Sequence, residues 1–267
     1  MSFGAGVQSV TLALLSQNRH PKIPVFDCAI FADTGAEPQS VYDSVDAVSS
    51  NVNFPVIITK HKEGLLNSIK DAARNKDKRF AGVPFFTQNP DGAVGMLKRQ
   101  CTNEYKIQPV KKAIREFLGY KKGQRVKHNV NLWIGISRDE MTRMTISRDA
   151  WIQHKYPLVE MEWRRSKCIS YLKQKWNHPF GKSSCTFCPY HDAQAWRELK
   201  NKDTESWQQI VEVDRQVRNG FKGADERLYL HKSCKPIDEV DFDAILARHD
   251  DQNEFGFLEE CEGMCGL

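Results

Sequence analysis

The stretch Ser2-Phe3-Gly4-Ala5-Gly6-Val7-Gln8-Ser9 places small residues where the chain turns into a helix. Glycines let backbone amides approach a phosphate closely, and a helix N-terminus adds a favourable dipole. Ser9 is positioned to donate its hydroxyl to the same phosphate. A plain glycine-rich turn is the alternative, because short glycine motifs also occur without any ligand. No strand is expected before this loop, since Met1 stands only three residues before Gly4.

Strands and helices alternate after the loop. Nearly continuous apolar residues over Ile23–Ala32 predict a buried strand, and Phe54–Thr59 predicts the next one. Apolar spacing predicts helices over residues 7–15, 40–48, 65–73 and 107–117. Units of this length, alternating strand with helix, indicate an α/β fold built on a parallel sheet.

The rest of the chain is expected to hold fewer strands. We predict strands over residues 131–136 and 156–159, and helices over 166–176 and 192–220, the last broken near Lys202. Residues 76–97 are expected to form a loop over a site, and the chain after Cys234 an acidic loop. We expect an adenine-nucleotide-binding α/β domain over residues 1–160. A cysteine-rich, metal-binding and helical part is expected over residues 161–267, packed on the first as one unit.

Composition restricts the class of protein. The 267 residues are 40% apolar and 27% charged, as in a globular protein with a buried core. No long apolar run and no secretory signal are visible, which favours a cytoplasmic protein without a membrane partner. The net charge is +5, with basic runs over residues 98–128 and 163–182. These runs are either solvated helix faces or surfaces for phosphorylated ligands or nucleic acid.

Eight cysteines are many for a cytoplasmic enzyme, and two of them form the motif Cys185-Thr186-Phe187-Cys188-Pro189. Two thiolates at this spacing can reach one metal centre. A redox dithiol and a pair of unconnected core cysteines are the alternatives. Cys28 lies in an apolar run and is expected to be a small core residue.

Five segments, in chain order, resemble the N-type ATP pyrophosphatase (PP-loop) superfamily and its phosphoadenosine phosphosulfate reductase branch. Gly4–Ser9 lies on the phosphate-loop pattern Ser-Gly-Gly-x-Asp-Ser, with Gly4 for the first Ser and Gln8 for Asp. The other four segments are Phe31-Ala32-Asp33-Thr34-Gly35 with Tyr42, Cys101–Val110, Gly135–Glu140 with Arg143, and Tyr156–Leu172. Residues after about 195 show little resemblance.

The resemblance implies a Rossmann-like, doubly wound parallel sheet with helices on both faces. ATP or an adenylyl sulfate, with Mg²⁺ as a further ligand, would bind at the carboxyl ends of the strands. The residues expected to hold the nucleotide are Ser2, Gly4, Ala5, Gly6, Gln8, Ser9, Asp33, Thr34, Lys106, Arg138 and Arg143.

The same resemblance implies a metal centre. Cys101 matches the first of two adjacent cysteines in the cluster-bearing reductases, and Thr102 stands at the second. Cys168 is the expected replacement, which makes Cys101, Cys168, Cys185 and Cys188 a four-thiolate set for a [4Fe-4S] cluster or for zinc. His178 or His191 could substitute for one cysteine, but each is rather expected to lie next to the ligands or at the surface.

The C-terminal segment Met264-Cys265-Gly266-Leu267 resembles the mobile tail that carries the nucleophilic cysteine of sulfonucleotide reductases. Cys265, with Cys261, is therefore expected to be catalytic, and a tail with incidental thiols is the alternative. Two enzyme functions follow: reduction of an adenylyl sulfate, or ATP-dependent sulfur insertion by a PP-loop sulfurtransferase. Sulfur insertion would require nucleic acid or a sulfur-donor protein as partner. The third hypothesis is a nucleic-acid-binding or regulatory protein with a vestigial nucleotide pocket, to which Gln8 in place of Asp points.

Overall fold

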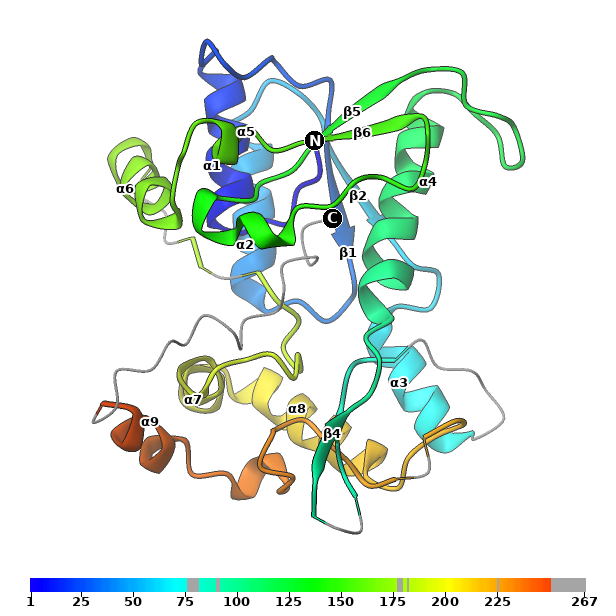
Figure 1. Ribbon diagram of the computed structural model, residues 1–267, viewed down its shortest axis with the longest axis vertical. Helices are drawn as coiled ribbons and strands as arrows, with labels where there is room; N and C mark the ends of the chain where they lie inside the picture. Colours follow the sequence, from blue (N-terminus) through cyan, green and yellow to red (C-terminus); the bar gives the residue numbers. More distant parts are fainter. Residues whose placement is uncertain (76–81, 90–91, 177–179, 182, 225, 251–267) are drawn as a thin grey trace.

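The computed structural model describes residues 1–75, 82–89, 92–176, 180–181, 183–224 and 226–250. Two pairs of parallel strands lie at the centre of its upper part (Figure 1). β1 (Ala29–Asp33) pairs with β2 (Val56–Lys60), and β5 (Val130–Trp133) pairs with β6 (Ile152–Lys155). None of the helices in these ranges combines the length and apolar character that a membrane crossing requires.

Residues 1–3 join the two strand pairs into one sheet. Ser2 forms a parallel bridge with Ile30, and its backbone N–H donates to the carbonyl of Trp133 at 2.9 Å. The expectation that no strand precedes the loop is therefore wrong, because this short segment occupies the central position. Numbered along the chain, the five segments have the spatial order 3-2-1-4-5, which is the Rossmann order.

Helices cover both faces of this sheet. Alternate residues of a strand point to opposite faces, and all five residues of β1 are buried. Phe31 belongs to the core formed with α1 (Val7–Gln17) and α2 (Gln39–Ser49), whereas Ile30 belongs to the core formed with α4 (Gln108–Phe117). This arrangement confirms the predicted fold class (Figure 1).

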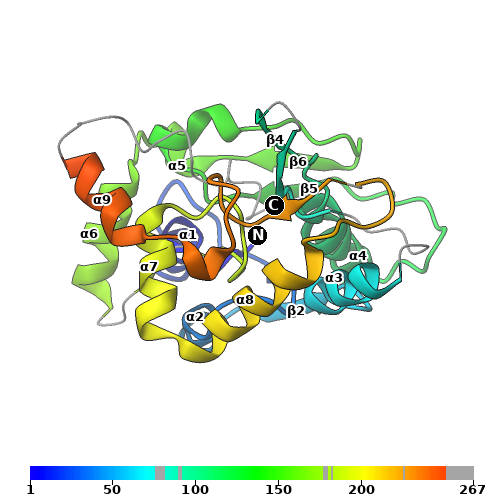
Figure 2. The same ribbon diagram turned by 90° about the horizontal axis from the view of Figure 1, so that it is seen from below.

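A second group of elements lies below the sheet (Figures 1 and 2). Its core buries Phe85, Trp196 and Ile210 almost completely. The elements of this group are α3 (Leu65–Arg74), α7 (Ala193–Lys202), α8 (Thr204–Val217), α9 (Phe242–Asp250), and an antiparallel sheet of β4 (Val94–Met96), β3 (Phe86–Gln88) and β7 (Leu228–Tyr229). The predicted break near Lys202 is confirmed by the separation of α7 from α8.

Several predicted elements are corrected. The predicted strand over residues 156–159 is the short helix α5 (Pro157–Glu160), because Pro157 is preorganised for a first helical turn. The predicted loop over 76–97 contains β3 and β4, which pair with β7 from a distant part of the chain. Residues after 234 include α9, and the strand expected from Ile23 begins only at Ala29.

The predicted domain boundary after residue 160 does not coincide with a boundary between hydrophobic cores. α6 (Arg165–Lys175) follows residue 160, yet it packs on α1 of the sheet part. Leu158, Trp163 and Leu172 share one core with α1 and α2. Residues 161–176 therefore belong with the sheet, and the elements from α7 onward join α3, β3 and β4 in the lower group.

Candidate active site

The glycine-containing loop lies at the point where the strand order reverses. Residues 1–3 lead into Gly4–Gly6 and then into α1, while β5 lies on the other side of residues 1–3. Ligands of open α/β sheets bind at the carboxyl ends of the strands at this switch point. Ala5 has a φ of 57°, an unfavourable value for a residue with a Cβ, and such outliers cluster at functional sites.

The N-terminus of α1 has no side-chain cap. Gly6 caps this 11-residue helix without a side-chain hydrogen bond, and no acidic residue lies in its first turn. Backbone N–H groups at a helix start carry partial positive charge, which favours a phosphate there. Ser9, by contrast, donates its hydroxyl to the carbonyl of Gly6 at 3.1 Å. Its expected hydrogen bond to phosphate would require that bond to break.

Two glycines allow close packing around this loop. A Cβ added to Gly135 would lie 2.7 Å from the backbone nitrogen of Ser9 and 2.9 Å from the carbonyl carbon of Gln8. A Cβ added to Gly6 would lie 2.8 Å from the hydroxyl of Ser183. The loop is therefore fixed between the segment after β5 and the segment that leads to Cys185.

A hydrogen bond to Glu140 explains why position 8 carries an amide side chain instead of a carboxylate. Its Nε2 donates to Oε2 of Glu140 at 2.9 Å, and the Ser137 hydroxyl donates to the same oxygen at 3.3 Å. Arg143 forms an ion pair with the other carboxylate oxygen of Glu140. An aspartate at position 8 would face this carboxylate and be repelled, whereas an amide can donate to it. Arg143 is therefore engaged with Glu140 beside the loop, and Arg138 has an exposed side chain.

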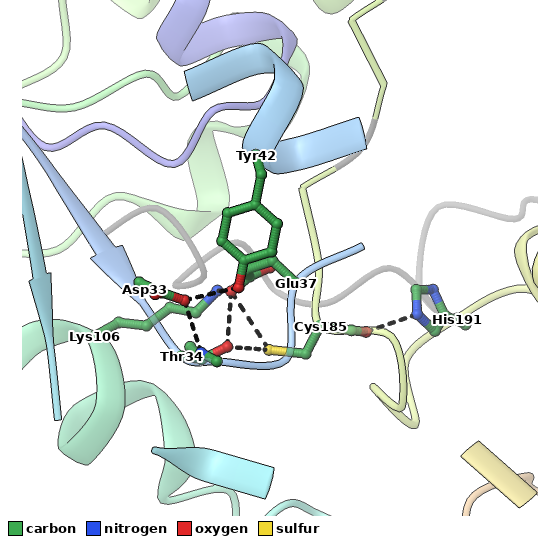
Figure 3. A network of polar contacts seen from close by, with 8 residues as sticks. Asp33, Thr34, Glu37, Tyr42, Lys106, Cys185 and His191 are labelled. Carbon is green, nitrogen blue, oxygen red and sulfur yellow. Dashed lines mark hydrogen bonds and ion pairs between the residues drawn. The ribbon is translucent and has the colours of Figure 1, made fainter. Parts of the chain in front are cut away.

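A second group of polar side chains surrounds Glu37, directly after β1 (Figure 3). One carboxylate oxygen of Glu37 accepts a hydrogen bond from the Thr34 hydroxyl at 2.9 Å and lies 3.4 Å from Nζ of Lys106. The Cys185 thiol lies 3.7 Å from the same oxygen and 3.4 Å from the Thr34 hydroxyl. Glu37 and Lys106 are both buried.

Glu37 is a functional candidate that the sequence analysis missed. A carboxylate is costly to bury unless it is paired, and Lys106 supplies the pairing cation. The other oxygen of Glu37 is buried and has no hydrogen-bond partner among the described residues. The sequence did contain a signal for this residue, since Glu37 is an acidic residue two positions after the glycine of the Asp33-Thr34-Gly35 turn.

Asp33 shapes the turn that carries Thr34 and Glu37. Its Oδ1 accepts hydrogen bonds from the backbone of Gly35 at 2.7 Å and from the Tyr42 hydroxyl at 2.9 Å. Burial and the hydrogen bond to Asp33 raise the pKa of Tyr42 well above its ordinary value. Asp33 therefore lies where it was expected, at the carboxyl end of β1, with these hydrogen bonds to the turn.

The structure brings together three of the four predicted metal ligands. Cys101, Cys185 and Cys188 line one small cavity with Thr34 and Lys106. Thr186 N–H also donates to the carbonyl of Ala36 at 2.8 Å, which fixes this segment against the turn after β1. His191 bonds through its ring to the carbonyl of Cys185 at 2.9 Å.

Cys168 lies elsewhere. It is fully buried in the core that α6 forms with α1, and burial raises the pKa of its thiol to about 12. In the part of the chain that the structure describes, no three His, Cys, Asp or Glu residues are arranged to hold a metal ion. Among the described residues, the predicted four-thiolate set is therefore not formed. His178, Cys261 and Cys265 lie outside the described residues.

Sheet order, the loop at the switch point and the uncapped start of α1 together define a protein of the Rossmann-like α/β class, in which ligands bind at the carboxyl ends of the strands. Residues 1–175 match the family model of the phosphoadenosine phosphosulfate reductase domain. The chain therefore belongs to this family and is an enzyme of the phosphoadenosine phosphosulfate reductase type.

Among solved structures, the chain is similar to the phosphate complex of phosphoadenylyl-sulfate (PAPS) reductase from Candida auris. The two share 16% identity over 67% of this chain and 72% of that chain, with a TM-score of 0.41. The family model, and not this distant likeness, carries the assignment. A comparison with curated proteins finds no match.

Proposed function

We propose that the enzyme binds an adenylyl sulfate with its phosphate on the loop Gly4–Gly6 and reduces the sulfate to sulfite. The observation that carries this proposal is the position of that loop. It joins the central segment to α1 at the reversal of strand order, and the N-terminus of α1 has no side-chain cap. Arg138 and Arg143, on the 3₁₀ turn Arg138–Arg143 beside the loop, supply positive charge for the remaining anionic groups.

The chemistry requires a thiolate. In the proposed reaction a cysteine thiolate attacks the sulfur of the adenylyl sulfate, an S–S bond forms, and the S–O bond to the nucleotide phosphate breaks. The products are the nucleotide with a free phosphate and an enzyme S-sulfocysteine. A second thiol, from a dithiol reductant, then attacks the cysteine sulfur, so that sulfite leaves and a disulfide remains. Cys265 is the proposed nucleophile.

Removing residues 261–267 tests the proposal. The truncated enzyme should lose sulfite formation and keep nucleotide affinity, because the loop and α1 are left intact. Adenylyl sulfate and phosphoadenylyl sulfate are each supplied with a dithiol, and ATP is supplied with a dithiol in the presence and in the absence of nucleic acid. Sulfite and pyrophosphate are measured in every case. If the truncated enzyme still forms sulfite, Cys265 is not the nucleophile. Pyrophosphate that forms from ATP only when nucleic acid is added, without sulfite from either sulfated nucleotide, would instead favour sulfur insertion, in which ATP activates an oxygen of that acceptor.

The cavity around Cys101, Cys185 and Cys188 supports a finer hypothesis. Three thiols on one cavity suit a metal or cluster with thiolate ligands, and three protein ligands leave one position for another group. The described side chains would have to move to bind such a group, because they do not form a metal-binding arrangement as they stand. Cys168 has no part in this hypothesis.

A further inference from the structure

A large open cavity lies between α1 and α6, at the end of α1 opposite the phosphate loop. Its volume is about 960 Å³, large enough for one or two nucleotides. α1 has 11 residues, and a helix of this length is about 16 Å long. The cavity, here called the α1–α6 cavity, is therefore a separate place from the nucleotide site.

Its lining combines aromatic rings with cations. Tyr171 and Trp176 supply partly exposed rings, and the buried Trp163 packs against Tyr171. Arg19, Lys167 and Lys175 supply the charges. Amide side chains also line it, and no Asp or Glu is found among the described residues that form it. This mixture matches what an unpaired nucleic acid strand requires: cations for phosphates, rings for base stacking, and amides for base edges.

The rings are held in place by the protein. Trp163 and Tyr171 meet edge to face with centroids 5.7 Å apart, and the Tyr171 hydroxyl accepts a hydrogen bond from Asn18 at 3.1 Å. Nζ of Lys167 lies 4.6 Å from the centroid of the Trp163 ring. Ordered rings lose little conformational entropy when a base stacks on them.

Arg19 gives an independent indication of function. It has a φ of 53° at the end of α1, where its backbone N–H donates to the carbonyl of Ser16. Helices that end in this conformation usually carry glycine there, because a Cβ is unfavourable. Arg19 thus combines an unfavourable backbone conformation with a cationic side chain that lines the cavity. Backbone outliers of this kind cluster at functional sites, which supports a functional hypothesis.

We infer that the α1–α6 cavity binds a single-stranded stretch of nucleic acid, through its phosphates at Arg19, Lys167 and Lys175 and by stacking of a base on the exposed part of the aromatic lining. The inference goes beyond the proposed reaction and does not depend on it. Single-stranded RNA and DNA present the same phosphates and bases, so the measurement includes both.

The experiment measures binding of dye-labelled 12-nucleotide RNA and DNA strands to the full chain by fluorescence anisotropy at several salt concentrations. The variant Arg19→Gly, Lys167→Gln, Lys175→Gln should weaken binding tenfold or more and lower the slope of log K against log[salt] by roughly 2. Arg19→Gly alone should keep or raise the melting temperature, because glycine accepts this backbone conformation without strain. A loss of affinity in that single variant is therefore not a folding defect.

Controls separate this site from other basic surfaces. Lys121→Gln, Lys122→Gln, Lys127→Gln removes three exposed cations from another basic run and should leave affinity nearly unchanged. Trp176→Leu should weaken oligonucleotide binding about tenfold but leave binding of heparin, which has no bases, as it is.

Adenosine 3′,5′-bisphosphate in excess should not displace the strand. Equal losses in the two triple variants, an unchanged affinity in Trp176→Leu, or displacement by the mononucleotide would each overturn the inference. Failure of the sulfite assay would not affect it.

Discussion

Gly135→Ala is the sharpest test of where the nucleotide binds, because the change is one methyl group beside the phosphate loop. The added Cβ would lie 2.7 Å from the backbone nitrogen of Ser9 and 2.9 Å from its Cα, whereas ordinary contacts begin at 3.4 Å. These neighbours are backbone atoms in the first turn of α1, so relief requires the helix start to move by roughly 0.7 Å.

The expected effect has two parts. Overpacking of this kind costs about 1–3 kcal/mol of folding free energy, and the shifted helix start should misalign the amides that face the phosphate. We expect affinity for adenosine 3′,5′-bisphosphate to fall at least tenfold, which corresponds to about 1.4 kcal/mol. Isothermal titration measures the affinity, and thermal unfolding of the free protein confirms that the variant is folded at the temperature of the titration.

Gly181→Ala is the matched control. A Cβ at Gly181 would meet no atom within 4 Å, so this variant should bind and unfold like the parent. If folded Gly135→Ala binds the nucleotide with unchanged affinity, the phosphate does not depend on the start of α1, and the placement of the site is wrong.

Two further predictions concern buried charge and a buried thiol. Lys106→Met should destabilise the protein by about 3–5 kcal/mol, since it leaves the Glu37 carboxylate buried without a cation, and the added change Glu37→Gln should recover much of this loss in urea unfolding. Cys168 is protonated in the folded state up to about pH 12, whereas the unfolded thiol ionises near 9.0. Its contribution to stability is therefore complete below pH 9 and declines as the pH rises to 12. Cys168→Ala should be less stable than the parent below pH 9 by roughly 1 kcal/mol, with a gap that narrows at higher pH, and should retain any iron or zinc that the purified protein holds. A constant gap, or loss of metal in this variant, would contradict the burial of Cys168 in a separate core.

The sequence by itself determined the elements whose signals are local. Helix α1 begins at Val7 as predicted, because the glycine turn and the apolar spacing lie within one short stretch. The apolar run ending at Ala32 identified β1 by its continuous burial, and alternation of strands with helices gave the parallel sheet. Order and spacing of five short segments, none decisive alone, then identified the family.

Tertiary structure decided what depends on distant segments. Residues 1–3 are too few to show a strand pattern, yet they become the central strand because β1 and β5 both bond to them. The β3–β4 hairpin forms against β7, which lies more than a hundred residues further along the chain.

The same reason separates the cysteines. Spacing could group Cys168 with Cys185, but α6 packs on α1 and buries Cys168 in another core. Glu37 is a candidate site residue because of its contacts with two distant segments (Figure 3). Lys106, on η1 (Asn103–Ile107), and the thiol of Cys185 both lie next to it at the carboxyl end of β1. A sequence pattern reports which faces are apolar along one element, whereas the meeting of side chains from three elements is fixed by packing in three dimensions.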